Sequence, residues 1–397
     1  MADLTGGELV VRVLAREGVG VIFTLCGGHI LPIYDACLRH GIRVIDVRHE
    51  QAAAHAADAW ARLTRALGVA VVVPGPGVTD AVTGVANANA ARSPLLLIGG
   101  GSPLGLKGRG ALQEMDQVSL MRPITKGAWA VPEPRLIPEY LARAVDVALS
   151  GQPGPVFVEI AVDLLMSTVD ERDAALPAPG ARGRAAPPAD AIDQVAALLA
   201  TSTRPAIVAG SGVYWDGAWT ALSRLAERAG VPVFPNGMAR GCLPHEHPMA
   251  YQLARSLGLR EADVVLVLGT PLDFRLGYGQ TPVFGEDARV VMVDAVGADF
   301  GRNRTLAAGI AADVGQTLAA LEATLPGGAA ARTESWRRRL RDKEDAERAK
   351  QMALAASDQT PITHYRLAER AGVPVFPNGM GRGCLPHGHP MAYQLAR

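Results

Sequence analysis

The sequence predicts an α/β fold with two consecutive doubly wound parallel-sheet domains. Short apolar runs of strand length alternate with longer segments whose apolar residues recur at helical spacing. The alternation occurs twice, on either side of a Pro/Ala/Gly-rich stretch at residues 174–188 that is unsuited to a core and indicates a linker. Such repeated alternation is typical of parallel sheets covered by helices.

Length and composition restrict the kind of protein. A chain of 397 residues suggests two or three domains. Basic and acidic residues balance at 39 each, so no charge excess favours nucleic acid. The apolar runs are too short to span a membrane, and the N-terminus does not resemble a signal peptide. No CxxC pair occurs among Cys26, Cys37, Cys242 and Cys384, which favours a reduced, cytoplasmic protein without structural zinc.

The first elements are a helix over residues 6–19 and a buried strand over residues 19–25, which ends in Cys26, Gly27, Gly28 and His29. Two glycines at this position allow the backbone to approach a ligand or to turn sharply. A turn without a ligand is an equally good interpretation of these residues alone.

A strand over residues 44–47 leads into an alanine-rich helix, with Glu50 at the junction. Open α/β sheets carry their working groups at the carboxyl ends of strands. The face that follows is small and apolar, at Ala52, Ala53, Ala56 and Ala57, which would favour a neutral carboxyl group. Taken alone, a glutamate in a first helical turn more often faces solvent and complements the helix dipole.

A third strand, over residues 68–73, ends in the turn Pro74, Gly75, Pro76 and Gly77, before a helix over residues 82–92 and a strand over 94–99. Glycines there allow close contact with a flat ring. A polar loop follows over residues 108–126, with Gln113, Glu114, Asp116 and Lys126, and could equally be a solvated loop. A helix over 136–149 and a strand over 155–160 complete this half.

In the second half, strands are predicted over residues 205–209, 231–234, 264–268 and 290–293. The turn Gly210-Ser211-Gly212 lacks the third glycine of the dinucleotide fingerprint, so NAD binding is not expected. The charged segment over residues 336–350 predicts an exposed helix.

The C-terminal segment is an unusual repeat. Residues 366–397 copy residues 224–255 at an offset of 142, and differ only at Ala239/Gly381 and Glu246/Gly388. Such near-identity indicates a recent duplication or a joining error rather than a solenoid. The paired histidines at 245 and 247, repeated at 387 and 389, favour a loop over a metal site. We expect residues 361–397 to pack loosely or to be disordered.

Several runs carry a resemblance to a known family. They are GGELVVRVLAREGV, FTLCGGHILPIYDA, RHEQAAAHAADAWAR, VVPGPGVTDAVTGVANA, GALQEMDQVSLMRPITK and GPVFVEIAVDLL. In order and spacing, the first 170 or so residues resemble the pyrimidine-binding domain of thiamine-diphosphate enzymes. They are most similar to acetolactate synthases and their relatives, the 2-hydroxyacyl-CoA lyases. The second half resembles the family's central domain, which holds FAD or an ADP moiety in some members, beside the segment over residues 269–275, and is only structural in others.

The resemblance implies a division of the chain. Residues 1–172 would be the pyrimidine-binding domain and 173–189 a linker. Residues 190–330 would be a Rossmann-like central domain and 331–360 a charged helix or linker. Residues 361–397 would stand where the family has a diphosphate-binding domain.

The resemblance also implies roles for site residues. Glu50 would hydrogen-bond the aminopyrimidine ring of thiamine diphosphate, and Gln113 would orient the substrate. The pocket would be shaped by Gly27, Gly28, Gly75, Pro76 and Gly77. Three positions depart from acetolactate synthases: His29 replaces a small residue, Asp80 replaces Asn, and Leu112 replaces Phe. Because of these departures, the resemblance does not determine which substrate the protein would use.

The family's third domain binds Mg²⁺ and the diphosphate through a GDG run and a later Asn. No GDG occurs in this sequence, so no metal ligand is expected here. The expected function is a carboligase or lyase acting on 2-keto acids, incomplete as written, and FAD remains an option. The alternatives are a 2-hydroxyacyl-CoA lyase, a non-catalytic remnant, and a flavin- or nucleotide-binding module. A homodimer or tetramer is expected, without a nucleic-acid or membrane partner.

Overall fold

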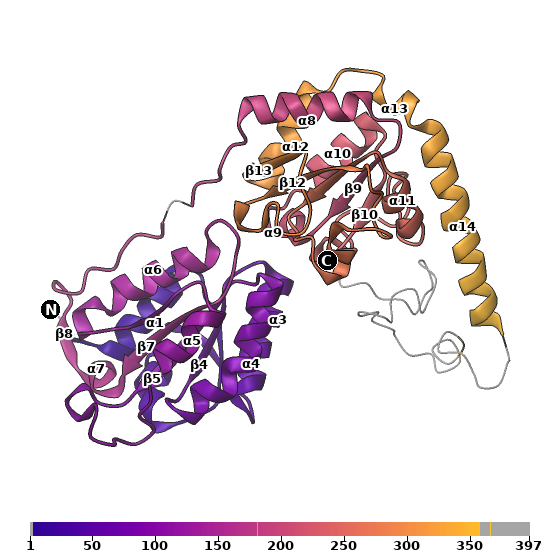
Figure 1. The fold of residues 1–397 in the computed structure, drawn as a ribbon. Coiled ribbons are helices and arrows are strands. Elements are labelled where there is room, and N and C mark those ends of the chain that lie inside the picture. Colours follow the sequence, from indigo (N-terminus) through magenta and orange to yellow (C-terminus); the bar gives the residue numbers. More distant parts are fainter. Residues whose placement is uncertain (1–2, 181, 358–365, 367–397) are drawn as a thin grey trace. The chain divides into compact units, whose positions relative to one another are not determined.

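The chain forms two compact units, one up to residue 183 and one from residue 184 (Figure 1). The computed structural model describes residues 3–180, 182–357 and 366. The predicted loose packing of residues 361–397 therefore falls outside the described residues, apart from residue 366. None of the described helices is long and apolar enough to span a bilayer.

The first unit is built on a six-stranded, fully parallel sheet. Its strands, in spatial order, are β3 Arg43–Asp46, β2 Val21–Thr24, β4 Gly68–Val72, β5 Leu95–Gly101, β7 Val156–Ala161 and β6 Ala128–Ala130. The carboxyl ends of all six strands meet at one edge of the sheet. The predicted fold class is confirmed in this unit.

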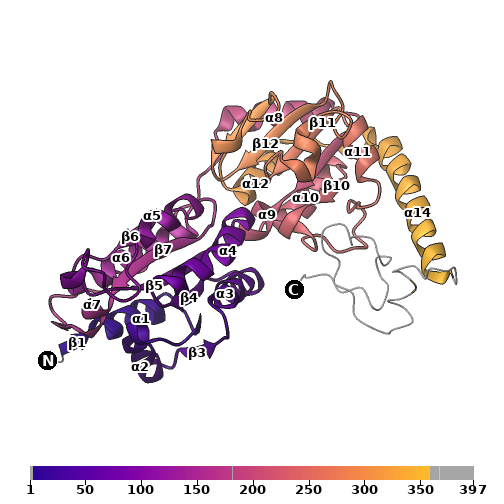
Figure 2. The ribbon, with the colours of Figure 1, turned by 60° about the horizontal axis from the view of Figure 1, so that its bottom comes forward.

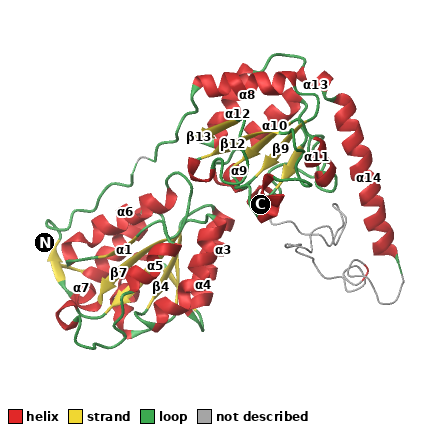
Figure 3. Ribbon diagram, in the orientation of Figure 1, coloured by secondary structure: helices red, strands yellow, loops and turns green. Residues whose placement is uncertain are grey.

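Helices cover both faces of this sheet (Figure 3). One face packs against α1 Gly6–Arg16, α2 Leu31–His40, α6 Ile137–Leu149 and α7 Val162–Met166. The other face packs against α3 Glu50–Thr64, α4 Pro76–Ala91 and α5 Gln117–Met121. Side chains alternate along a strand, so Val71 enters the first core while Ala70 and Val72 enter the second. This unit also contains a separate antiparallel pair of strands, β1 Asp3–Thr5 and β8 Thr168–Asp170.

Some predicted elements differ from the observed ones. The helix predicted over residues 82–92 begins earlier, at Pro76, because proline is well tolerated in the first helical turn. The loop predicted over residues 108–126 contains α5. The strands β1, β6 and β8 were not predicted, since an isolated run of three residues is too short to be recognised as a strand.

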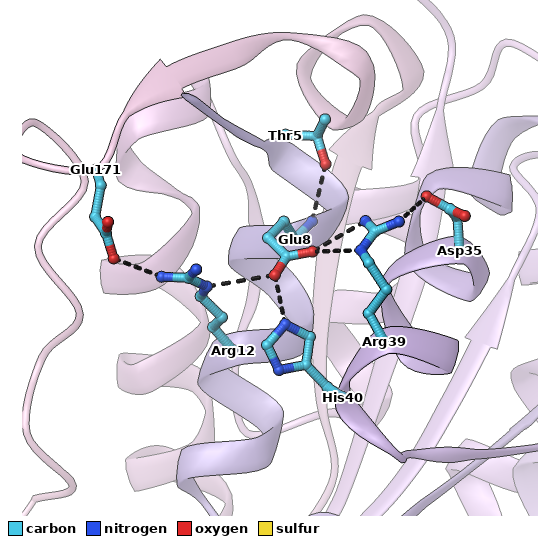
Figure 4. A network of polar contacts seen from close by, with 7 residues as sticks. All are labelled: Thr5, Glu8, Arg12, Asp35, Arg39, His40 and Glu171. Atoms are coloured by element: carbon cyan, nitrogen blue, oxygen red, sulfur yellow. Dashed lines mark hydrogen bonds and ion pairs between the residues drawn. The ribbon is translucent and has the colours of Figure 1, made fainter. Parts of the chain in front are cut away.

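A buried carboxylate joins α1 to α2 (Figure 4). Glu8 lies in the first turn of α1, where its N–H donates to the Thr5 hydroxyl at 3.2 Å. Its carboxyl group contacts the Nη2 atom of Arg39 at 3.0 Å, the Nε atom of Arg12 at 3.4 Å and the ring of His40. Burial by itself would raise the pKa of Glu8, but hydrogen bonds from His40, Arg39 and Arg12 outweigh it and lower that pKa.

The second unit holds a five-stranded parallel sheet, so the predicted fold class is confirmed here as well (Figure 2). Its strands, in spatial order, are β10 Val233–Pro235, β9 Pro205–Ala209, β11 Val264–Leu268, β12 Arg289–Asp294 and β13 Ala308–Ala311. The helices are α8 Ala189–Thr201, α9 Ser211–Trp215, α10 Trp219–Ala229, α11 Arg255–Glu261, α12 Val314–Thr324, α13 Ala329–Arg332 and α14 Glu334–Ala356. The short strand β13 was not predicted.

The predicted exposed helix over residues 336–350 is only partly exposed. Within α14, Trp336 and Leu340 enter the core on one face of the second sheet. The indole Nε1 of Trp336 donates to the carbonyl of Pro205 at 3.1 Å. Glu344 is 1% exposed and accepts hydrogen bonds from the backbone N–H groups of residues 252–254. These buried residues were not predicted, because charged residues dominate the composition of the segment.

Candidate active site

Four loops meet at the carboxyl edge of the first sheet, and they carry the predicted site residues. A Cβ atom added to Gly27, after β2, would overlap Val73, after β4. One added to Gly77 would lie 3.3 Å from Oε1 of Glu50, after β3. One added to Gly75 would lie 2.8 Å from the carbonyl oxygen of Gln113, after β5. The fold therefore brings residues from four separate segments into one place.

Glu50 is the first residue of α3, and it is only 7% exposed. The preceding residue, His49, caps the helix, because its Nδ1 accepts the N–H of Gln51 at 3.2 Å. The predicted apolar face is corrected in one respect. Ala52 is exposed and Ala56 half-buried, and the buried alanines are Ala53, Ala54, Ala57 and Ala61. The helix turns this buried stripe toward the sheet and toward α4.

The turn between β4 and α4 requires glycine. Gly75 has φ +62° and ψ −111°, a backbone conformation that side chains oppose. Pro76 follows at the start of α4, and Gly77 faces the carboxyl group of Glu50. A side chain at Gly77 would crowd both Glu50 and Val73, the latter at 2.7 Å. The turn thus presents bare backbone beside a buried carboxyl group.

Gln113 reaches the same turn through its backbone. It is half-buried and has φ +62°, which is uncommon for a residue with a side chain. Its neighbour Leu112 is 75% exposed. The structure therefore places the backbone of Gln113 against Gly75, and its role as a substrate-orienting residue stays a prediction.

The loop after β2 is more open. Gly28 begins a short 3₁₀ turn, Gly28–Ile30, and a Cβ atom added to it would meet no atom within 4 Å. His29 lies beside Gly100, at the end of β5, where an added Cβ would be 3.1 Å from that of His29. Burial lowers the pKa of His29 and so favours its neutral form at neutral pH.

Sequence reasoning missed Gln117, a buried residue that binds the glycine turn. It appeared only within the run DQVSLMRP, and no local pattern marks it as important. Its side-chain Oε1 accepts the N–H of Gly75 at 2.9 Å.

Sequence reasoning also missed the closeness of His49, Glu50 and Asp80. Among the described residues these three offer ligand atoms within 4.8 Å of one another. The Nε2 atom of His49 lies 3.7 Å from Oδ2 of Asp80. Because Nδ1 accepts an amide hydrogen, the neutral ring carries its proton on Nε2 and presents a donor to Asp80 rather than a lone pair to a metal. We therefore assign no metal to this cluster.

The central unit has its own glycine-lined edge. Gly210 and Gly212 follow β9 and pack against Gly269, which follows β11. Asn236, after β10, is 1% exposed. Its Nδ2 lies 3.2 Å from the hydroxyl oxygen of Thr270, while its buried Oδ1 has no hydrogen-bond partner among the described residues. Asp273 and Arg275, in the segment predicted to border a nucleotide, form an ion pair with each other at 2.5 Å.

The paired histidines at 245 and 247 have structural contacts. The Nε2 atom of His247 lies 2.8 Å from the Ser223 hydroxyl and 2.9 Å from Glu227. His245 contacts Arg348 through its Nε2 at 3.1 Å. These contacts support the prediction of a loop rather than a metal site at residues 245 and 247; the copies at 387 and 389 lie outside the described residues.

The first unit is thus an open, parallel α/β domain with a buried glutamate facing a glycine turn at its carboxyl edge. The family model for the "thiamine pyrophosphate enzyme, N-terminal TPP binding domain" matches residues 4–120. The model for the "thiamine pyrophosphate enzyme, central domain" matches residues 192–321. The chain belongs to the thiamine pyrophosphate enzymes and contains these two domains.

Relatives within the family are of two kinds. The chain is 39% identical to the acetolactate synthase large subunit of Mycobacterium tuberculosis over 363 residues, which cover 91% of this chain and 65% of that protein. It is 40% identical to human 2-hydroxyacyl-CoA lyase 2 over 323 residues, covering 73% of this chain and 51% of that protein. The Caenorhabditis elegans 2-hydroxyacyl-CoA lyase 2 is 37% identical, with coverage of 86% and 59%. The chain thus spans less than two thirds of the length of these relatives.

Proposed function

We propose that the first unit binds the aminopyrimidine ring of thiamine diphosphate, with the carboxyl group of Glu50 hydrogen-bonded to a ring nitrogen. The observation that carries this proposal is the closeness of Glu50 to Gly77, which leaves a buried carboxyl group beside backbone without side chains. A flat heterocycle needs such a surface for close approach, and a ring nitrogen needs a carboxyl group that shares a proton with it.

The residues present fit this group. Gly75, Pro76 and Gly77 form one wall, because a side chain at either glycine would collide with the residues around it. Gly27 and Gly28 form the other wall, and Gly28 faces open space. When bound, thiamine diphosphate supplies a nucleophilic carbon and an electron sink for making or breaking a bond next to a carbonyl. Glu50 then holds or shares a proton at its carboxyl oxygen, and Gln113 lies beside the turn, where it can orient a substrate.

For the whole protein we propose a thiamine-diphosphate-dependent carboligase or lyase of the acetolactate synthase-like type, acting on 2-keto acids. The runner-up is a 2-hydroxyacyl-CoA lyase, because His29 and Leu112 depart from the acetolactate synthase pattern and leave the substrate open. Both kinds of relative support the shared chemistry equally well. We assign Mg²⁺ and the diphosphate to the family's third domain rather than to residues of these two units. We also propose that the protein forms a homodimer or tetramer and lies in the cytoplasm. Among the described residues, the thiols of Cys26 and Cys37 are free, which supports a reducing compartment.

A second candidate function concerns the central unit. The unpartnered Oδ1 of Asn236, beside Thr270 and near the glycine-lined edge, favours a bound group that donates a hydrogen bond, such as the ribose or ring of FAD or ADP. The protein purified under mild conditions would then carry a yellow flavin or a nucleotide that denaturation releases. A colourless protein that releases no nucleotide would contradict this assignment.

The test of the main proposal is calorimetric titration of the full chain with thiamine diphosphate and Mg²⁺. Glu50→Gln should weaken binding strongly while leaving the unfolding midpoint nearly unchanged. A matched control is Glu139→Gln, since Glu139 also lies in a first helical turn but is exposed. It should bind like the unsubstituted chain. In a full-length enzyme that also carries the diphosphate-binding domain, Glu50→Gln should lower the rate with a 2-keto acid by about a hundredfold or more. Absence of binding, or equal binding by all three proteins, would contradict the proposal.

A further inference from the structure

The side chain of Gln117 is buried among three elements of the first unit. It lies at the start of α5 and is 2% exposed. Its Oε1 accepts the N–H of Gly75 at 2.9 Å, and its Nε2 donates to the carbonyl of Gly100 at 2.9 Å and to Oε2 of Glu159 at 2.8 Å. The orientation of the amide is fixed, because rotating it by 180° would place donor against donor and acceptors against acceptor.

These three contacts tie the glycine turn to the rigid part of the sheet. Gly100 belongs to β5 and Glu159 to β7, and both strands are interior members of the sheet. Gly75, by contrast, lies outside any strand and has the positive φ already described. Glycine is conformationally permissive, so the hydrogen bond from its N–H to Gln117 on α5 restrains a turn that the local backbone preference would leave free.

The position of the turn sets the space at Glu50. Gly75 leads within two residues to Gly77, whose backbone faces Oε1 of Glu50. On the other side, the backbone of Gln113 packs against Gly75. A shift of the turn by a few tenths of an ångström would therefore open or close the gap between Gly77 and the carboxyl group of Glu50. Catalytic and binding geometries are sensitive to displacements of this size.

We propose that Gln117 is a positioning residue for the cofactor pocket, which fixes the glycine turn opposite Glu50 through the N–H of Gly75 and is itself anchored by Gly100 and Glu159. This inference rests on the proposed function of the pocket. It assigns Gln117 no contact with cofactor or substrate. Its effect passes through the backbone of the turn.

The first measurement is hydrogen exchange of the full chain, followed in the peptide that contains residues 73–78. Gln117→Met removes all three polar contacts at similar length. It should speed exchange of the Gly75 amide by about tenfold or more, because that N–H loses its acceptor. Asp58→Asn is the matched control. Asp58 is also buried in the first unit and accepts hydrogen bonds from Arg62 and Asn87, away from the turn. It should leave exchange at residues 73–78 unchanged.

The second measurement is thiamine diphosphate affinity by calorimetry, with Mg²⁺ present. Gln117→Met should weaken binding by about tenfold, while Asp58→Asn should not, even if both lower the unfolding midpoint equally. Gln117→Glu near neutral pH keeps an acceptor for Gly75 but faces Glu159 with a second carboxylate. The double variant Gln117→Glu with Glu159→Gln restores a donor opposite an acceptor. It should recover much of the affinity that Gln117→Glu alone loses.

The outcomes separate this inference from the proposed function. If the unsubstituted chain binds no thiamine diphosphate, the proposed function fails, and exchange at Gly75 still decides whether Gln117 fixes the turn. If Gln117→Met leaves exchange at residues 73–78 unchanged, the inference is wrong whatever the affinity. It is also wrong if Asp58→Asn weakens cofactor binding as much as Gln117→Met does.

Discussion

Gly77 and Glu50 face each other across the turn between β4 and α4. A Cβ atom on Gly77 would lie 3.3 Å from Oε1 of Glu50 and 2.7 Å from a methyl group of Val73. The second distance is too short for real atoms, so any side chain at Gly77 forces Val73 or the turn to move. The glycine is thus required by its neighbours. It places backbone, rather than a side chain, beside the buried carboxyl group of Glu50.

Gly77→Ala should therefore lower the free energy of unfolding by about 1–3 kcal/mol through overpacking. It should also weaken thiamine diphosphate binding. The higher helix propensity of alanine, worth about 1 kcal/mol, offsets only part of this loss. Urea denaturation measures the first effect and calorimetry the second. Gly20→Ala is the control, because its Cβ would meet no atom within 4 Å. Equal stability of Gly77→Ala and the unsubstituted chain would show that Val73 adjusts freely.

Glu8→Gln should destabilise the first unit at neutral pH, because Arg12, Arg39 and His40 would lose a common anion (Figure 4). Hydrogen bonds to charged groups suggest a loss of about 1–3 kcal/mol. The folded-state pKa of Glu8 lies below its ordinary value of 4.5. Its contribution is therefore complete above pH 4.5 and is lost as the pH falls through the lower, folded-state pKa. Thermal unfolding from pH 7 downward should show a shallower acid slope for Glu8→Gln. An unchanged slope would contradict this account.

Asp216 should have the opposite pH dependence. Burial, followed by the nearby charge of Asp313, raises the pKa of Asp216 from 3.8 to about 6. Between these two values the folded chain holds a proton that the unfolded chain has released. Stability from this group therefore falls as the pH rises through that window, by roughly 1 kcal/mol per pH unit. Asp216→Asn should remove the slope and be more stable than the parent above pH 6, as followed by thermal unfolding. Retention of the slope would assign it to another group.

Glu344→Ala should be among the most destabilising substitutions in α14. It would leave the backbone N–H groups of residues 252–254 without their acceptor in a buried place. Unsatisfied buried donors suggest a loss of about 3 kcal/mol in urea denaturation. On the same helix, Glu347 forms ion pairs with Lys343 and Lys350, which are at least partly exposed, so Glu347→Ala should have little effect. Similar losses for the two variants would show that the contacts of Glu344 are not decisive.

The sequence predicted most elements because local pattern carries them. The strands predicted over residues 205–209 and 264–268 match β9 and β11 at both ends, since buried parallel strands are continuous apolar runs. The strands β6 and β13 were not predicted, because their short sequences, AWA and AGIA, consist mainly of small residues and lack a run of β-branched ones. The buried residues of α14 were not predicted, because Arg and Glu dominate the composition of that helix.

By itself, the sequence established the α/β class, the resemblance to thiamine-diphosphate enzymes and the place of Glu50 at a strand-to-helix junction. These features depend on residue type and spacing along the chain. Only the tertiary structure decided that Gly77 faces Glu50, that Gln113 packs on Gly75, and that Gln117 ties the turn to β5 and β7. Such contacts join residues that are 17 to 42 positions apart, and they exist only once the sheet aligns the carboxyl ends of its strands.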